Sequence, residues 1–256
     1  MKGSSNVLKN ICSPTNLMID KTFLSQIAIK NQTTLRNILR EYYQHLFLSY
    51  FYQMKQSEHF FFKGGTALKI AFRSPRFSED LDFNATTNFS TFETIEQDVL
   101  IAIKKDGIDS NITESKKTSG GFFAIISSRM YDEQVIIKIQ ASKRVKKPIQ
   151  GEKIIVISDF FPAYPLQILA RELLFTEKIA AFLRRAKSRD YFDLYYILRS
   201  GIKLKILADK AKEIKSVIEK ETGRFAELKE LLPQNFWSIL KDLKNNILLE
   251  LQKQHF

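Results

Sequence analysis

Apolar and polar positions divide the chain into helical and strand-like segments. Over residues 21–54, apolar side chains recur at three- and four-residue steps, which predicts one amphipathic helix leading into the core. The aromatic run at residues 59–63 stops at two glycines, and residues 66–73 then suit a helix. This order predicts a strand, a glycine turn and a second helix.

The segments that follow predict a small sheet. Residues 74–79 contain a proline and favour a loop, whereas residues 80–84 alternate carboxylate and apolar side chains, as a strand does when one face contacts the core. We also expect a helix near residues 92–105, a hairpin of residues 121–130 and 134–141, and a strand at residues 153–157. From about residue 170 helical periodicity dominates, with interruptions near Gly201 and Pro233.

These segments predict an α+β fold, in which a small mixed sheet with flanking helices is followed by a helical C-terminal region. The chain has 256 residues, of which 44% are hydrophobic, so it can form a substantial core. The pattern changes at residues 160–165, which contain two prolines. We therefore assign residues 1–160 to the core with an N-terminal helical extension, and residues 161–256 to a mainly helical C-terminal domain.

Charge and cysteine content narrow the function classes. Forty Lys and Arg against 28 Asp and Glu give a net charge of +12, which favours polyanionic partners, although a basic composition can also arise without functional reason. The single cysteine, Cys12, excludes an intramolecular disulfide and a cysteine-based zinc site. With no signal-peptide pattern and no apolar stretch long enough to span a membrane, we expect a cytoplasmic protein without membrane contact.

Two carboxylates are the leading candidates for chemistry. Residues two apart on a strand point to the same face, so Asp80 and Asp82 are expected side by side while Leu81 and Phe83 enter the core. Adjacent anions repel each other, and hard divalent cations prefer oxygen ligands. The pair therefore predicts a site for Mg²⁺ (or Mn²⁺), and the alternative is a strand end solvated by water.

A glycine turn precedes the carboxylates. Gly64 and Gly65 lie between the expected strand and helix, where glycine lets backbone amides approach a phosphate group and the helix N-terminus favours negative charge. The spacing of a Walker A loop is absent. Phosphate and metal are thus expected at one edge of the sheet, and a tight turn without a ligand is the alternative.

The stretch at residues 63–83, KGGTALKIAFRSPRFSEDLDF, resembles the signature of the AbiEii/AbiGii toxin family. Members are nucleotidyltransferase-like proteins of the DNA polymerase β superfamily and act as toxins in type IV toxin–antitoxin and abortive-infection systems. The resemblance implies a polymerase β-like nucleotidyltransferase core and metal binding by Asp80 and Asp82. It also implies contacts to nucleotide phosphates from Lys63, Gly64, Gly65, Thr66 and Ser78.

A second stretch, EKIAAFLRRAKSRDYFDLYYIL at residues 177–198, resembles a later part of the same family. By this resemblance Lys178 and Asp193 are the expected catalytic pair, with Asp190 as the alternative carboxylate. Lys178 can neutralise triphosphate charge, and Asp193 can anchor that lysine or orient the acceptor. The alternatives are an ordinary charged helix face and, for Arg189 with Asp190, a structural ion pair.

One position departs from the polymerase β pattern, which has a third metal-binding carboxylate on a later strand. Residues 135–141 contain Lys138 and Gln140 but no acid. Either two protein carboxylates hold the metal, or the third comes from elsewhere, with Asp193 as the candidate.

The sequence therefore predicts a metal-dependent nucleotidyltransferase that uses a nucleoside triphosphate. The resemblance implies RNA as acceptor, particularly the tRNA 3′ end, and a toxin with a cognate antitoxin protein. The basic residues compatible with RNA binding are Lys143, Arg144, Lys146, Lys147, Arg184, Arg185 and Lys187. Two alternatives stay open: a catalytically silent nucleic-acid-binding or antitoxin-binding protein with the same fold, and a nucleotidyltransferase that acts on a small molecule or a protein.

Overall fold

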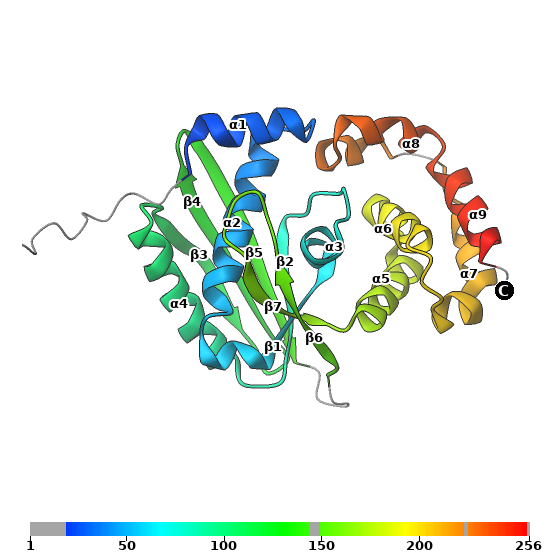
Figure 1. Ribbon diagram of the computed structural model, residues 1–256. Coiled ribbons are helices and arrows are strands. Elements are labelled where there is room, and N and C mark those ends of the chain that lie inside the picture. Colours follow the sequence, from blue (N-terminus) through cyan, green and yellow to red (C-terminus); the bar gives the residue numbers. More distant parts are fainter. Residues whose placement is uncertain (1–18, 144–148, 223–224, 255–256) are drawn as a thin grey trace, which may run out of the picture.

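A seven-stranded mixed sheet forms the centre of the computed structural model, which describes residues 19–143, 149–222 and 225–254. The strand order is β3-β4-β5-β2-β1-β7-β6 (Figure 1). The strands are β1 (Phe60–Lys63), β2 (Asp80–Ala85), β3 (Ser110–Lys117), β4 (Gly121–Met130), β5 (Glu133–Lys143), β6 (Gly151–Val156) and β7 (Tyr164–Leu169). Strand β2 is antiparallel to β1 and parallel to β5, and β4 and β5 form the expected hairpin.

One face of the sheet is closed by helices α2 (Leu35–Phe51) and α4 (Phe89–Lys105) (Figure 1). Aromatic rings fill this layer: Phe51 lies 5.1 Å from Phe83 of β2, and Phe92 lies 4.9 Å from Phe122 of β4, measured between ring centroids. These rings are nearly excluded from solvent and supply much of the hydrophobic stabilisation of the core.

The single long helix expected over residues 21–54 is wrong. The structure has α1 (Lys21–Lys30) and α2, with a break between them. Gln32 has a φ of 50°, which ends the first helix, and the side chain of Thr34 accepts a hydrogen bond from the backbone of Asn37 and caps the second. The apolar period continues across the break, so periodicity alone could not reveal it.

Two strands were not expected from the sequence. β3 is an edge strand, and its polar, mostly exposed residues show no clear alternation. β7 overlaps residues 160–165, where the change of pattern suggested a boundary, and it lies in the sheet between β1 and β6. The sheet therefore continues past residue 160, and the helical part of the chain begins at Arg171.

The C-terminal part consists of helices beside the sheet (Figure 1). They are α5 (Arg171–Arg185), α6 (Ser188–Arg199), α7 (Lys205–Glu219), α8 (Trp237–Lys241) and α9 (Leu243–Lys253), with 3-10 turns η2 (Ala226–Leu231) and η3 (Gln234–Phe236); η1 (Lys55–His59) precedes β1. The interruptions near Gly201 and Pro233 are confirmed. No helix of the described residues is long and apolar enough to cross a membrane.

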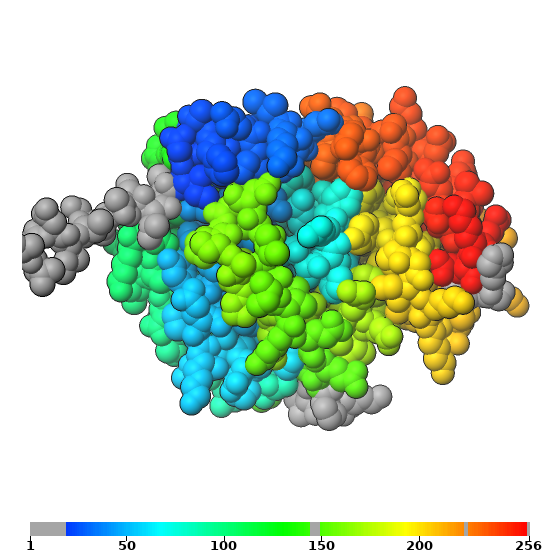
Figure 2. Space-filling view, viewed as in Figure 1, coloured from blue at the N-terminus to red at the C-terminus, as the bar shows by residue number. Residues whose placement is uncertain are grey.

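The C-terminal segment also packs against the N-terminal helices. In Figure 2 the α1 region and the segment that contains η3 and α8 adjoin each other on the surface. The backbone N–H of Gln234 donates to the backbone carbonyl of Gln32 at 2.9 Å. The side-chain amide of Asn37 donates to the backbone carbonyl of Glu230 at 2.8 Å. Hydrogen bonds therefore join the region of α1 and α2 to the segment of η2 and η3.

Candidate active site

Strand β2 carries two carboxylates on the face opposite the aromatic core. Leu81 and Phe83 are buried, whereas Asp80 and Asp82 are partly exposed on the other face. This alternation confirms the expected placement of the pair. The position follows from strand geometry, because a shift of one residue would put both carboxylates into the core.

Helix α3 (Gly64–Phe72) begins directly against these carboxylates. Gly64 has a φ of +84°, and a Cβ atom on it would lie 2.1 Å from Oδ2 of Asp82. A Cβ atom on Gly65 would lie 2.7 Å from the Ser78 hydroxyl oxygen. Both glycines are therefore required for the close approach of the α3 N-terminus to Asp82 and Ser78.

Thr66 and Ser78 differ in their access to this edge. The Thr66 side chain is fully buried, and its hydroxyl donates to the backbone carbonyl of Asp80. This hydrogen bond connects α3 to β2. The buried position of the Thr66 side chain therefore does not support the expected contact between Thr66 and a phosphate. Ser78 is partly exposed, its carbonyl accepts from Gln44 at 2.9 Å, and its hydroxyl faces Gly65.

The carboxylates of β2 resist ionisation. Burial raises the pKa of Asp80 above its ordinary value, against opposing effects of Arg189 and Lys138. Burial also raises the pKa of Asp82, and the charge of Asp80 raises it further, although nearby cations oppose the shift. The two negative charges are therefore incompletely neutralised by the protein, which is the electrostatic condition of a cation site.

Asp193 has the opposite environment. It is 1% exposed and accepts two hydrogen bonds from Arg76, at 2.8 and 3.0 Å, and one from Lys178 at 2.8 Å. Burial alone would raise the pKa of Asp193, but Arg76 and Lys178 outweigh it and lower the pKa to about 2. Both carboxylate oxygens are occupied, so Asp193 is poorly placed as a third metal ligand and instead anchors Lys178.

Lys63 and Lys178 lie near Asp82 but each has an acidic partner. Their positive charges partly oppose the rise that burial and Asp80 produce in the pKa of Asp82. Lys63 pairs with Glu177 at 3.0 Å, as Lys178 does with Asp193. The pairing fixes both ammonium groups beside the carboxylates, where they can meet a substrate anion without rearrangement.

The alternative of a structural ion pair between Arg189 and Asp190 is wrong. Asp190 is buried, pairs with Arg185 at 2.7 Å and accepts from the Lys187 amide at 3.1 Å, so it caps the start of α6. Both carboxylate oxygens of Asp190 are thus occupied by Arg185 and the Lys187 backbone, which is a structural role. Arg189 forms no hydrogen bond or ion pair with the described residues, and its charge acts on Asp80 and Asp82.

Sequence reasoning missed Lys138 and Arg189 as members of the site. In the parallel pairing of β2 with β5, Lys138 is opposite Asp80 and Gln140 is opposite Asp82. The strand position without an acid therefore does adjoin the carboxylates. No local sequence pattern predicts this register, because α4, β3 and β4 separate β2 from β5 along the chain.

The donor set suits a hard divalent cation. Two carboxylates on one face are the usual protein ligands of Mg²⁺, which completes its shell with water and substrate phosphates. Within the described residues no group of three or more His, Cys, Asp or Glu side chains is placed to hold a metal. The residues present therefore fit one Mg²⁺ that shares its shell with a substrate, and they do not form a closed protein cage.

Two cavities meet at Asp82 and Lys63. One, of about 380 Å³, runs along α5 and is lined by Gly64, Lys178 and Arg185 among others. The other, of about 550 Å³, lies over β5 and β4 and is lined by Gln140 and Phe123 among others. The carboxylate is thus accessible from two sides.

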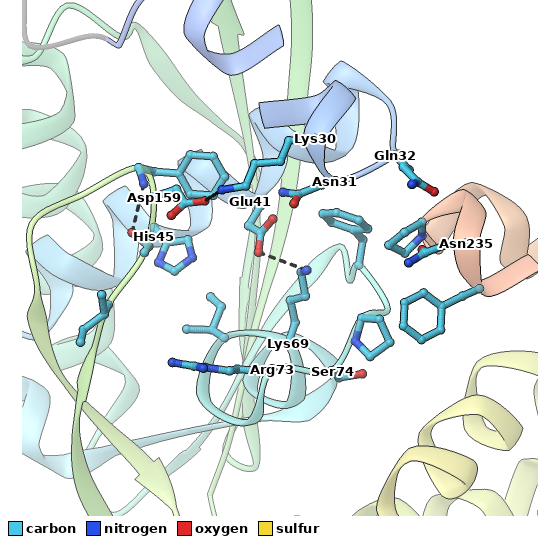
Figure 3. A pocket seen from close by; sticks show the side chains of 18 residues that line it. Lys30, Asn31, Gln32, Glu41, His45, Lys69, Arg73, Ser74, Asp159 and Asn235 are labelled. Carbon is cyan, nitrogen blue, oxygen red and sulfur yellow. Dashed lines mark hydrogen bonds and ion pairs between the residues drawn. The ribbon is translucent and has the colours of Figure 1, made fainter. Parts of the chain in front are cut away.

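A third cavity, of about 580 Å³, lies away from this site, between α1, α2, the end of α3 and the loop before β7. Figure 3 shows Glu41 and Lys69 pointing at each other within it, at 3.5 Å, beside the buried His45. None of the residues expected for catalysis lines it. This cavity is therefore separate from the two cavities that meet at Asp82.

Known proteins share this architecture. MenT4, a nucleotidyltransferase toxin from Mycobacterium tuberculosis H37Rv, superposes with a TM-score of 0.63 at 16% identity, over 92% of this chain and 90% of that one. JHP933 from Helicobacter pylori superposes with a TM-score of 0.62 at 20% identity, over 87% of this chain and 93% of that one. No match was found among curated proteins. At these identities the structural likeness establishes the fold alone.

The family is established by sequence. Residues 46–252 match the model of the AbiEii nucleotidyl transferase toxin of type IV toxin–antitoxin systems. The match begins within α2, includes the glycine turn and both carboxylates, and ends within α9. Because this match covers residues 46–252 of a 256-residue chain, the protein belongs to the AbiEii family of nucleotidyltransferase toxins.

Proposed function

We propose that this toxin transfers a nucleotide from a nucleoside triphosphate to an RNA, with the tRNA 3′ end as the preferred acceptor, and that it requires Mg²⁺ (or Mn²⁺). The observation that carries the proposal is the placement of Asp80 and Asp82 on one face of β2, against the N-terminus of α3. Two incompletely neutralised carboxylates and a helix N-terminus form a surface that can hold a metal ion and phosphates together.

The residues around the carboxylates support binding of a triphosphate. Gly64 and Gly65 let the N-terminus of α3 pack directly against Asp82 and Ser78, so a phosphate bound through a metal at Asp82 would lie beside the α3 N-terminus. Lys178 is fixed by Asp193, and Arg189 is free of partners among the described residues. These cations neutralise phosphate charge, which Lys does as a point charge and Arg through a planar fork.

In the proposed reaction an acceptor hydroxyl attacks the α-phosphorus in line with the departing pyrophosphate. The oxygen–phosphorus bond forms, the bond to the β-phosphate oxygen breaks, and the hydroxyl proton leaves to water. Mg²⁺ held by Asp80 and Asp82 would polarise the phosphate and lower the pKa of the hydroxyl. The protein contributes position and charge, because no covalent intermediate is needed.

RNA as the acceptor is supported by charge and by the family resemblance. The chain carries a net charge of +12, and Arg184 and Arg185 line the cavity along α5. Lys143 ends β5 three residues after Gln140, the residue opposite Asp82, whereas Arg144, Lys146 and Lys147 lie outside the described residues. We further propose a cognate antitoxin protein and a cytoplasmic site of action, in keeping with the toxin–antitoxin family.

The experiment incubates purified protein with each radiolabelled triphosphate, Mg²⁺ and total RNA. Wild type should label RNA, and Asp82→Asn should reduce the rate by about 100- to 1000-fold, the scale of a lost electrostatic contact in a transition state. Asp98→Asn, which changes an exposed carboxylate on α4, is the matched control and should keep the wild-type rate.

Each other outcome overturns a stated part of the proposal. Equal labelling by wild type and Asp82→Asn removes the carboxylates from the reaction. Label in a small molecule or a protein excludes RNA as acceptor. RNA binding without any transfer favours a silent nucleic-acid-binding protein with the same fold.

A further inference from the structure

We propose that the single-stranded 3′ end of the acceptor lies across the open face of β5, β4 and β3, with Phe123 as a stacking surface and Lys138 as a phosphate contact. We call this surface the open sheet face; it consists of Lys116, Phe123, Ile125, Lys138, Gln140 and Ser142. The inference rests on the proposed function, because it assigns the acceptor a place in the same site.

Strand register places the open sheet face in line with the carboxylates. Gln140 is opposite Asp82 across β2 and β5, Phe123 is opposite Gln140 across β4 and β5, and Lys116 is opposite Phe123 across β3 and β4. Directly opposed residues point to the same side of a sheet. One row of side chains thus runs from Asp82 to the edge strand.

A second row runs parallel to the first. Lys138 is opposite Asp80, and Ile125 is opposite Lys138. Strands are separated by about 4.8 Å, so β4 lies about 10 Å from β2. That distance spans only the terminal nucleotides of a strand whose hydroxyl reaches the carboxylates.

The face is open in the described part of the protein. Along β5, residues Val135, Ile137 and Ile139 are buried against the helices, whereas Lys138 and Gln140 are exposed. On β4, Phe123 and Ile125 are only partly buried. The cavity of about 550 Å³ lies over this face and joins Phe123 and Gln140 to Asp82. A large aromatic ring and a cation beside a catalytic pair are therefore available to a ligand.

The chemistry of the face fits a single nucleic-acid strand. Single strands bind where an aromatic side chain stacks on a base and cations contact the backbone. Phe123 offers the ring, and Gln140 and Ser142 offer hydrogen bonds. Lys138 forms no hydrogen bond or ion pair with the described residues, whereas Lys116 pairs with Glu114 at 2.5 Å. Lys138 is therefore the cation free to meet a phosphate.

The direction of the reaction separates the two cavities. In an in-line displacement the attacking oxygen and the departing pyrophosphate lie on opposite sides of the phosphorus. The cavity along α5 contains Gly64 and Lys178, which suits the triphosphate. The acceptor must then approach from the other side of Asp82, and that side is the open sheet face.

The test measures binding of a fluorescent single-stranded RNA of about 12 nucleotides, within the site sizes of single-strand-binding proteins. All variants carry Asp82→Asn and no triphosphate is added, so binding is measured apart from transfer. Phe123→Ala should raise the Kd by about 5- to 150-fold, the value of one stacked base. Lys138→Glu should also weaken binding and reduce the salt slope by about one phosphate contact.

Matched controls are Phe23→Ala and Lys105→Glu, which change exposed residues of α1 and α4. Both should bind RNA as the parent does, and thermal unfolding checks that every variant is folded. Unchanged Kd values for Phe123→Ala and Lys138→Glu overturn the inference, as does equal weakening in the controls. If these two variants lose only binding to the cognate antitoxin, the face is a protein interface and the inference is also overturned.

The readout separates this inference from the proposed function. RNA binding that depends on Phe123 and Lys138 supports the assigned surface even where no nucleotide is transferred. Phe123→Ala and Lys138→Glu are therefore also made with Asp82 intact and supplied with a triphosphate. Normal RNA binding and normal transfer by these two variants would keep the function and remove the surface.

Discussion

Asp193 and Asp82 are carboxylates near the same lysine, Lys178, yet Asp193 and the pair on β2 have opposite electrostatic environments. Asp193 is enclosed by Arg76 and Lys178, and its pKa falls to about 2. Asp80 and Asp82 lie side by side on one face of β2, and nearby cations only partly neutralise their charge. Burial raises the pKa of both. The first carboxylate is neutralised by the protein itself, whereas the second pair is left in need of an external cation.

This difference separates a carboxylate with a structural role from the two carboxylates that we propose for the chemistry. A buried carboxylate with its partners inside the protein stabilises one arrangement of Arg76, α5 and α6, and removing it leaves buried charges without compensation. Carboxylates with a raised pKa store unfavourable electrostatic energy that a bound cation can release. The comparison can be broken by three measurements.

The largest effect on stability is expected from Asp193→Asn. This change leaves Arg76, which is 3% exposed, and Lys178 without their anion, so the free energy of unfolding should fall by about 3–5 kcal/mol. Urea denaturation measures the loss. Asp82→Asn is the control, and it should not destabilise the protein without metal because it removes a repelling charge. A loss as large for Asp82→Asn would contradict the comparison.

A smaller effect is expected from Mg²⁺. A ligand that binds the folded state alone at about 100 times its Kd stabilises a protein by about 2.7 kcal/mol. Adding Mg²⁺ to wild type should therefore raise the melting temperature, and a chelator should reverse the shift. Asp193→Asn should retain part of the response if it folds, whereas Asp82→Asn should lose it. A response unaffected by Asp82→Asn would place the metal elsewhere.

The smallest effect is expected from acid. As the pH falls through the raised pKa values of Asp80 and Asp82, each carboxylate is neutralised and transfer should decline by about tenfold per pH unit for each. Asp193, whose pKa is lowered from 3.8 to about 2, contributes its full stability above 3.8 and loses it only towards pH 2. Activity should therefore disappear before this ion pair does.

The pH profile of kcat/KM at fixed Mg²⁺, compared with near-ultraviolet circular dichroism, measures the two events. Loss of activity and of tertiary structure at the same pH would show that Asp193 and the pair on β2 are protonated together, which would contradict the comparison. Mg²⁺ competes with protons for Asp80 and Asp82, so raising its concentration should move the activity loss to lower pH.

Local sequence predicted what local geometry decides. The alternation from Asp80 to Phe83 determines both the strand and the face of each side chain, and Gly64 and Gly65 predicted the turn because few other residues permit the close approach. The strand β7 was missed because Pro165 lies inside it, opposite Ile155, and proline ordinarily argues against a strand.

The sequence did not predict which strands pair or which distant side chains form ion pairs. Lys138 adjoins Asp80 only because β5 pairs with β2 in parallel across a long connection, which hydrophobic packing fixes. Arg185, rather than the adjacent Arg189, reaches Asp190, since helix start and cap geometry decide which arginine points inward. Asp193 was recognised by resemblance, but its dependence on Arg76 required the structure.

The bridge from Arg76 to Asp193 also determines when the site is complete during synthesis. Arg76 leaves the ribosome early, and its partner follows more than a hundred residues later. Lys178 and Arg189 are likewise made after the whole sheet. A partly synthesised chain therefore contains β2 with its two carboxylates but still lacks Lys178, Arg189 and Asp193. The arrangement of Arg76, Lys178 and Asp193 therefore forms only after α5 and α6 have been made and have packed beside the sheet.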